Sequence, residues 1–258
     1  MRKIVYVILF VFLLVLSTCG GLYGQEKPRV LFDEYHAVWD PEQRYVDFIS
    51  ELETNGYIVD FSHGKIESSL LSSYDTLVLS IPFRYFHEDE KNAIKEFVKN
   101  GGGLIIFGER GGWMEYKGIS TAVNSISTIF GIEFNIDQVE DEEKNRSGKE
   151  WHPVFTECKH HPVTRGITSI AYISGCSLNL QSSATALIYG NSSTVANGQK
   201  GKEVIILAAA EYGNGKVLVM GDTDFLVGEN TEGYDTDYLS LRDNKKLGLN
   251  MVEWVTPE

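Results

Sequence analysis

Residues 97–108 read FVKNGGGLIIFG, and this stretch carries most of the information about the fold class. It ends a segment, 87–100, whose apolar residues recur at helical spacing. Three glycines then stop the helix, and the apolar run 104–108 follows without polar alternation. Strands covered on both faces have this composition in parallel sheets. The stretch therefore predicts one helix-to-strand step of a parallel α/β sheet.

The same alternation of strands and helices occurs upstream. The sequence predicts strands at 29–33, 57–61 and 75–81, and a helix over 41–55 that stops at Gly56. Three strand-helix units in succession indicate a doubly wound, mainly parallel sheet with helices on both faces.

Downstream, the pattern changes to shorter elements. A helix is expected over 119–130, followed by a solvated acidic loop over 137–150. The runs 204–210 and 216–220 flank a glycine-rich turn and should pair as a hairpin. The second half is thus expected to add a β-rich part to the parallel sheet.

The chain ends in a predicted helix over 244–255, which Asp243 is expected to cap. Neither an internal repeat nor a linker divides the chain. We therefore expect a single domain over residues 28–258.

Charge excludes one class of partner. The chain of 258 residues has 36 acidic and 23 basic residues, a formal net charge of −13. Such a surface repels phosphate backbones, so nucleic acid is not an expected partner.

The N-terminus predicts export. Arg2 and Lys3 precede the apolar run 4–16, which would span about 20 Å as a helix and is too short to cross a bilayer. We interpret residues 1–18 as a signal peptide and 19–27 as a tether. The segment Leu16-Ser17-Thr18-Cys19-Gly20 resembles the lipobox of prokaryotic lipoproteins, in which the cysteine is acylated. An extracytoplasmic protein is expected, either lipid-anchored at Cys19 or cleaved before Lys27 and free of the membrane.

Two cysteines remain after the tether, Cys158 and Cys176. In an oxidising compartment they form either a disulfide or two buried free thiols, and their spacing does not distinguish these alternatives. Asn145 and Asn191 begin glycosylation-type motifs, which predict exposed loops.

A family resemblance rests on several motifs in a fixed order: Val30–His36, Tyr74–Asp75, Phe97–Leu104, His161–Ile167, Gly221–Phe225 and Asp243–Trp254. Together they resemble the class I glutamine amidotransferase-like superfamily, in an exported prokaryotic branch related to the GIFT domain of an intraflagellar transport protein. The resemblance implies a flavodoxin-like sheet. It also implies a catalytic cysteine on a Gly-x-Cys-x-Gly turn after the fourth strand.

That turn reads Gly108-Glu109-Arg110-Gly111-Gly112 here. Arg110 stands at the cysteine position and stays protonated, so it cannot attack a carbonyl. Glutaminase activity is therefore not expected, and we assign no catalytic residue.

Polar residues that follow the strands are the candidate ligand-binding set, since open α/β sheets bind ligands at the carboxyl ends of their strands. The set is Asp33, Glu34, His36, Glu109, Arg110, Asp222 and Asp224. If these residues converge, they suit a cationic or hydroxylated ligand or a divalent cation, although no cofactor is required.

Structural roles compete with binding for three of these residues. His36 is also typical of a hydrogen-bonded structural histidine, and Asp222 of a turn next to Gly221. Glu109 and Arg110 together can simply fix the loop that contains them.

Three functional hypotheses follow. The preferred one is a non-catalytic module that binds a small molecule, glycan or protein. The second is a hydrolase that uses Asp33, His36 and Glu109. The third is carbohydrate binding at a cell surface, since Trp39, Trp113 and Trp151 fall in loops, where they form either a sugar platform or lids over the core.

Overall fold

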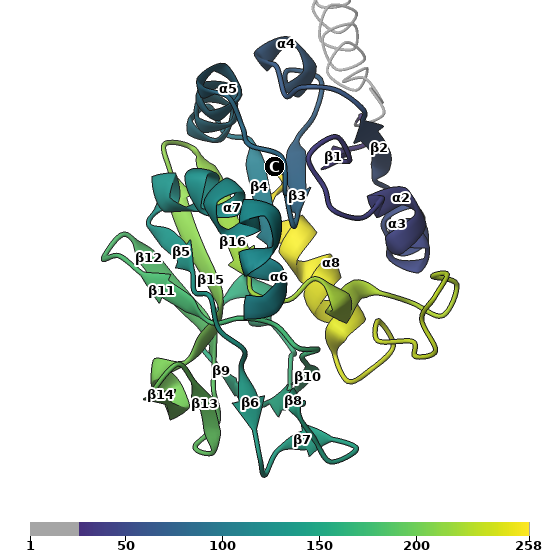
Figure 1. The fold of residues 1–258 in the computed structure, drawn as a ribbon. Helices are drawn as coiled ribbons and strands as arrows, with labels where there is room; N and C mark the ends of the chain where they lie inside the picture. Colours follow the sequence, from purple (N-terminus) through teal and green to yellow (C-terminus); the bar gives the residue numbers. More distant parts are fainter. Residues whose placement is uncertain (1–25, 258) are drawn as a thin grey trace, which may run out of the picture.

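The structure is a computed structural model that describes residues 26–257, and its centre is a mixed β-sheet flanked by helices (Figure 1). One half of the sheet is parallel, in the order β2-β1-β3-β4-β16. Its strands are β1 (Arg29–Asp33), β2 (Ile58–Ser62), β3 (Thr76–Ser80), β4 (Gly103–Phe107) and β16 (Gly215–Met220). The first four confirm the predicted strands to within two residues at each end.

The other half of the sheet is antiparallel and begins at the predicted hairpin. Strand β15 (Ile205–Tyr212) pairs with β16 in the expected sense, with Ala210 opposite Val217. The sheet then continues through β11 (Leu178–Leu180) to β5 (Ile132–Phe134), while β12 (Ala184–Tyr189) pairs with both β15 and β9 (Glu157–Cys158).

Helices cover both faces of the sheet. They are α2 (Pro41–Arg44), α3 (Val46–Thr54), α4 (Ser68–Leu71), α5 (Glu88–Lys99), α6 (Gly111–Glu115), α7 (Ile119–Ser127) and α8 (Asn244–Val255). Alternate strand residues enter two separate cores. Val30 and Phe32 pack with α3 and α8, whereas Leu31 packs with α5 and α7. Both faces are therefore buried, which explains the unbroken apolar runs in the sequence.

The glycine stop at 101–103 acts as predicted. Gly101 has φ +117°, which an L side chain rarely adopts, and the Phe97 ring occupies the space where Gly102 would carry a Cβ. At its other end, α5 begins with a backbone hydrogen bond from His87 N to Glu90 Oε2 (2.9 Å).

The predicted helix over 41–55 is wrong at one residue. Tyr45 separates α2 from α3 with φ −111° and ψ 30°, and its side chain is fully buried. Its hydroxyl is within 2.7 Å of Ser80 Oγ, a contact made across 35 residues. A tertiary hydrogen bond thus accompanies a helix break that apolar periodicity did not reveal.

The acidic stretch 137–150 was wrongly predicted to be a loop. It contributes β6 (Glu140–Asp141), β7 (Asn145–Arg146) and the start of β8 (Lys149–Phe155), which pair in two small sheets with β10 (Ile170–Ala171), β13 (Thr194–Ala196) and β14 (Gln199–Lys200). Asp141 is buried and accepts hydrogen bonds from the hydroxyls of Ser193 (2.6 Å) and Thr194 (2.7 Å). Distant partners therefore allow a charged segment to become ordered.

One glycosylation-type motif also differs from its prediction. Asn191 is only 1% exposed, and its amide donates to Asp141 Oδ2 and to the Val154 carbonyl. A buried, fully engaged amide is not a glycan acceptor in the folded protein.

Asp243 precedes α8 as expected but does not cap it. Its carboxylate instead accepts from the backbone of Thr168 (2.7 Å) and Ser169 (3.0 Å), which fastens the start of α8 to a distant loop.

Within residues 26–257, none of the helices has both the length and the apolar character needed to cross a membrane. The predicted signal peptide, 1–18, and the lipidation site, Cys19, lie outside the described residues.

Candidate functional site

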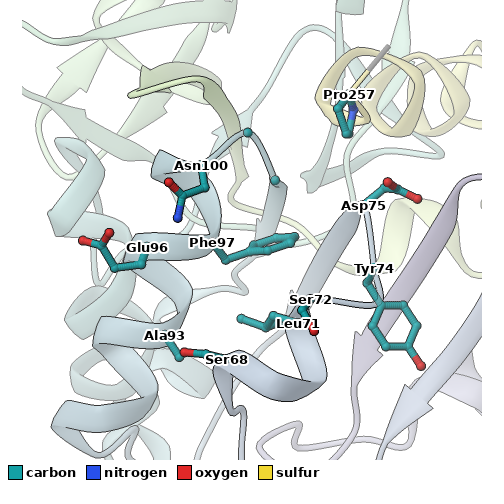
Figure 2. A pocket seen from close by; sticks show the side chains of 12 residues that line it. Ser68, Leu71, Ser72, Tyr74, Asp75, Ala93, Glu96, Phe97, Asn100 and Pro257 are labelled. Atoms are coloured by element: carbon teal, nitrogen blue, oxygen red, sulfur yellow. The ribbon is translucent and has the colours of Figure 1, made fainter.

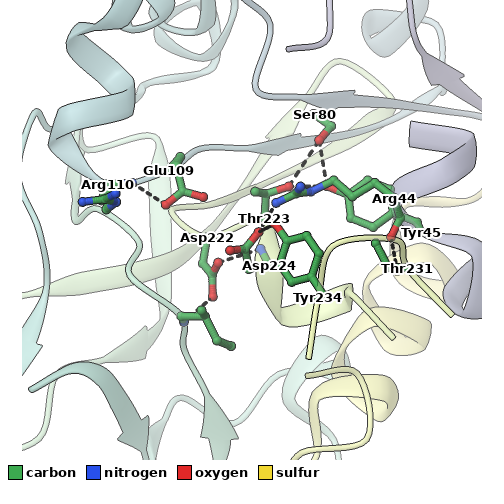
Figure 3. Close-up of polar contacts among 11 residues, drawn as sticks. Arg44, Tyr45, Ser80, Glu109, Arg110, Asp222, Thr223, Asp224, Thr231 and Tyr234 are labelled. Atoms are coloured by element: carbon green, nitrogen blue, oxygen red, sulfur yellow. Dashed lines mark hydrogen bonds and ion pairs between the residues drawn. The ribbon is translucent and has the colours of Figure 1, made fainter. Parts of the chain in front are cut away.

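A cavity of about 700 Å³ lies at the carboxyl edge of the sheet, where β4 and β16 end. Its lining comes from distant parts of the chain: Trp39, Glu109, Arg110, Trp113, Gln138, Trp151, His152, Ile173, Ser174, Asp224, Gly233, Tyr234 and Tyr238. Its size falls within the range of small-molecule sites. Figure 3 shows the polar residues beneath it.

Three of the predicted acidic residues meet here. Glu109 follows β4, and Asp222 and Asp224 follow β16, which is its neighbour in the sheet. Asp222 is fully buried and accepts backbone hydrogen bonds from Ile173 and Asp224, each at 2.7 Å. Asp222 thus holds the turn, while Glu109 and Asp224 line the cavity.

Arg44 provides the main counter-charge. Its guanidinium forms an ion pair with Asp224 (Figure 3). It also lies 3.9 Å from the centre of the Trp39 ring. Burial lowers the pKa of Arg44, but Asp224 acting together with Tyr45, Tyr234 and Glu109 outweighs burial and raises it. Arg44 therefore stays charged although it is 5% exposed.

Glu109 is held toward its neutral form. Burial raises the pKa of its carboxyl well above the usual value, and the charges of Asp224 and Asp222 raise it further. Among the described residues, its carboxyl accepts one hydrogen bond, from Arg110 N to Oε1 (2.9 Å). The other oxygen is available to a ligand.

A chain of hydroxyls supports the floor of the cavity. Tyr45 Oη lies 2.7 Å from Ser80 Oγ and also contacts Thr223, which is 3.2 Å from Ser80. These groups join α2, β3 and the segment after β16 (Figure 3). The next residue, Ile81, has φ +43°, a strained value for a β-branched residue, so the carboxyl end of β3 is tightly constrained.

Asp33 and His36 do not join this group. His36 Nδ1 lies 2.8 Å from Asp33 Oδ2, and His36 Nε2 lies 3.3 Å from Glu90 Oε1. All three side chains are 1% exposed, and the His36 ring stacks on Phe86. His36 is thus placed as a hydrogen-bonded structural histidine in a separate buried cluster.

Glu34 belongs to a third location. It pairs with His63 (3.2 Å), and its carboxylate oxygen lies within 4.8 Å of those of Asp40 and Glu42. Such groups of carboxylates are common at protein surfaces without a cation. The predicted residues therefore divide among three places, and the cavity receives Glu109, Arg110 and Asp224.

The three tryptophans expected in loops converge at the cavity, but only Trp39 lies in a loop, since Trp113 belongs to α6 and Trp151 to β8. Trp39, Trp113 and Trp151 all line the cavity, and the ring centres of Trp39 and Trp113 are 5.0 Å apart. Two tyrosines, Tyr234 and Tyr238, complete the aromatic wall, with ring centres 6.2 Å apart.

Arg110 stands at the rim of the cavity and begins α6 with φ −57°. Cys176 lies under the same turn, since its Sγ would be 3.5 Å from a Cβ at Gly108. This thiol is fully buried, and burial raises its pKa well above the usual value, as does the nearby Asp137. A nucleophilic thiol needs a lowered pKa instead.

Both cysteines are free thiols in the structure, so the disulfide alternative is not the arrangement found. Cys158 is partly buried on β9, and burial raises its pKa to about 11.

A second cavity, of about 520 Å³, lies at the opposite edge of the sheet (Figure 2). Leu71, Ala93 and Phe97 provide its apolar wall, and Asp75 and Glu96 are its only carboxylates among residues 26–257. One oxygen of Asp75 accepts from Arg29 N (2.7 Å). This cavity contains none of the predicted site residues.

Sequence reasoning missed Arg44, His152 and Tyr234. Arg44 falls within the helix expected over 41–55, and its partner, Asp224, is 180 positions away. His152 follows the segment 137–150, which was expected to be a loop.

The mixed α/β fold is similar to the glutamine amidotransferase-like fold of several solved structures. ThuA-like proteins, which have this fold, are among the neighbours. One from Bacteroides uniformis has a TM-score of 0.53 at 16% identity, over 92% of this chain and 94% of that one.

More particular similarities point to the GIFT domain. The family model for the IFT52 GIFT domain matches residues 30–154. The mmIFT52 N-terminal domain has a TM-score of 0.73 at 18% identity, over 89% of this chain and 98% of that one. A Salmonella typhimurium cytoplasmic protein, STM3548, has a TM-score of 0.61 at 16% identity, over 90% of this chain and all of that one.

A sequence relative comes from Aquifex aeolicus (strain VF5). This protein, described as uncharacterized, is 22% identical over 195 residues, which are 72% of this chain and 77% of the relative. These likenesses support the expected similarity to the GIFT domain and to the amidotransferase-like fold.

Proposed function

We propose that this chain is an exported, non-catalytic ligand-binding module of the glutamine amidotransferase-like superfamily. It belongs, in this proposal, to a prokaryotic branch related to the GIFT domain, with the flavodoxin-like, doubly wound sheet of that superfamily. The parallel strand order β2-β1-β3-β4-β16 supports this topology.

The observation that carries the proposal is the cavity with Arg110 at its rim. Amidotransferases hold a reactive thiol at this turn. Here the corresponding place is a cavity lined by aromatic and polar side chains, and the residue at the cysteine position is Arg110, which is not a nucleophile. Cys176, the thiol under the turn, is buried and has a raised pKa.

The hydrolase alternative loses its geometric support. It required Asp33 and His36 to act with Glu109, yet Asp33 and His36 are bonded to one another and to Glu90 or Ser62. Neither lines the cavity.

Localisation follows from the N-terminal sequence, and the fold fits display at a surface. Residue 26 leads into β1 at the amino edge of the sheet, while the cavity lies at the carboxyl edge. A chain anchored through Cys19 would present the cavity away from the membrane.

Two assays test this function. Purified protein should not hydrolyse glutamine, simple esters or glycosides, and turnover of any of these by wild type but not by Glu109→Gln would overturn the proposal. A small-molecule thermal-shift screen should find a stabilising ligand. At 100 times its Kd, one ligand contributes about 2.7 kcal/mol, or a Tm rise of about 5–11 °C.

Matched glutamate variants locate the binding. Glu109→Gln alters the cavity at the carboxyl edge, and Glu96→Gln alters the second cavity. The ligand-dependent rise should shrink only in Glu109→Gln. A ligand-dependent Tm rise that shrinks only in Glu96→Gln would place binding in the second cavity and contradict the proposal.

A further inference from the structure

Three of the chain's four tryptophans line one cavity. The Trp39 and Trp113 rings meet edge to face at 71°, and Trp151 is 43% exposed. Flat aromatic faces that remain partly exposed favour a ligand with flat or ring-shaped apolar surfaces.

Arginines of the protein already lie over three of the aromatic rings in the lining, one tryptophan and two tyrosines. Arg44 lies over Trp39 (3.9 Å) and Tyr234 (5.2 Å), and Arg146 lies over Tyr238 (5.8 Å). Arg44 also neutralises Asp224. A cationic ligand would therefore find neither a free aromatic cage nor an unpaired negative charge.

An anionic ligand is disfavoured as well. The chain has a formal net charge of −13, and the carboxyl groups of Glu109 and Asp224 in the lining offer no positive charge. Arg110 is the only arginine or lysine in the lining and is exposed to solvent. A neutral ligand fits this balance of charge.

The lining also contains polar groups without partners. His152 is 7% exposed, and its Nδ1 has no hydrogen-bond partner in the described structure. Burial lowers the pKa of His152 to about 4, so the ring is neutral at pH 7 and has one donor and one acceptor nitrogen. Glu109 lines the same cavity, and its Oε2 accepts no hydrogen bond from the described residues. Hydroxyl groups both donate and accept, so they suit both partners.

We propose that this cavity binds a neutral saccharide, with its ring against the tryptophans and its hydroxyls on His152 and Glu109. This inference rests on the proposed ligand-binding function and assigns its ligand class. The same chemistry is offered by a free oligosaccharide and by the exposed end of a surface polysaccharide.

A glycan array with neutral, uronic acid and sialylated oligosaccharides tests the class, and calorimetry with the best neutral oligosaccharide measures its affinity. Trp113→Ala and His152→Gln should each weaken binding at least tenfold. Trp254→Phe is the matched control because Trp254 packs on His161 outside this cavity, and it should bind as wild type. Melting curves verify that each variant is folded. Binding to isolated polysaccharide but not to oligosaccharides would identify the surface polymer as the source.

The outcomes separate this inference from the proposed function. No binding to any neutral glycan, or binding confined to acidic glycans, overturns the saccharide. If amino acids or nucleosides stabilise the wild type but not Trp113→Ala, the ligand class is wrong while the binding function stands. Turnover of a bound glycoside would refute the non-catalytic function and leave the saccharide in place.

Discussion

Removal of Arg44 should strongly destabilise the protein. Arg44 is 5% exposed and pairs with Asp224, which is 17% exposed, so the Arg44→Met variant leaves a largely buried carboxylate without its cation. Methionine retains most of the side-chain volume, and the charge is therefore the main difference.

The size of the effect follows from the burial of the pair. Breaking a buried ion pair by removing one partner costs about 3–5 kcal/mol. For a domain of this size each kcal/mol corresponds to a Tm change of about 2–4 °C, so Tm should fall by about 6–20 °C. The loss should be greater at pH 7.5 than at pH 4.5. Without Arg44, the folded-state pKa of Asp224 rises, and the uncompensated charge is lost as the pH falls through that value.

Urea unfolding at both pH values measures the loss. Arg165→Met is the control, since Arg165 pairs with Glu253 at the surface (3.0 Å, 68% and 62% exposed) and should change stability little. The double variant R44M/D224N should recover part of the loss. A loss below about 1 kcal/mol, or one equal at both pH values, would refute the argument that Arg44 compensates buried negative charge.

Three further outcomes are expected. The folded-state pKa of His152 is about 4 against about 6.5 unfolded, so its contribution to stability is present above pH 6.5 and is lost as the pH falls toward 4. The free energy of unfolding of the wild type minus that of H152Q should fall by about 1–2 kcal/mol across that pH window. This is less than the full pKa shift implies, because the ring borders an open cavity. A difference that does not change with pH would contradict the prediction. Asn244→Ala should cost about 2–4 kcal/mol in urea unfolding, since its side chain bonds Ala171 N and O and the Phe225 and Tyr238 carbonyls; a cost below about 1 kcal/mol would contradict this. Cys158 and Cys176 should be alkylated at pH 7 only after unfolding, as mass spectrometry can show, and their resistance in denaturant without reductant would reveal a disulfide instead.

The local sequence pattern was sufficient to predict the strands that are buried on both faces of the sheet. Apolar runs such as 104–108 have to be covered on both faces, so the parallel strands and their order of appearance followed from sequence. The glycines at 101–103 and the hairpin turn were equally local signals.

Local pattern failed where distant partners determine the conformation. Tyr45 breaks a helix beside its contacts with Ser80 and Thr223, and the acidic stretch 137–150 forms strands next to Asp141, whose partners lie about 50 residues away. The partners of Tyr45 and of Asp141 are far away in the sequence, so a prediction from neighbouring residues cannot include them.

The sequence by itself determined the kinds of residue available at the carboxyl edge: carboxylates after β4 and β16, an arginine at position 110 and tryptophans at 39, 113 and 151. Only the tertiary structure decided which of them meet. Strand order places β3 between β1 and β4, so Asp33 and His36 join Glu90 while Glu109 and Asp224 join Arg44. The physical reason is that chain position places a residue after its own strand, whereas its partners depend on how strands, helices and loops pack together.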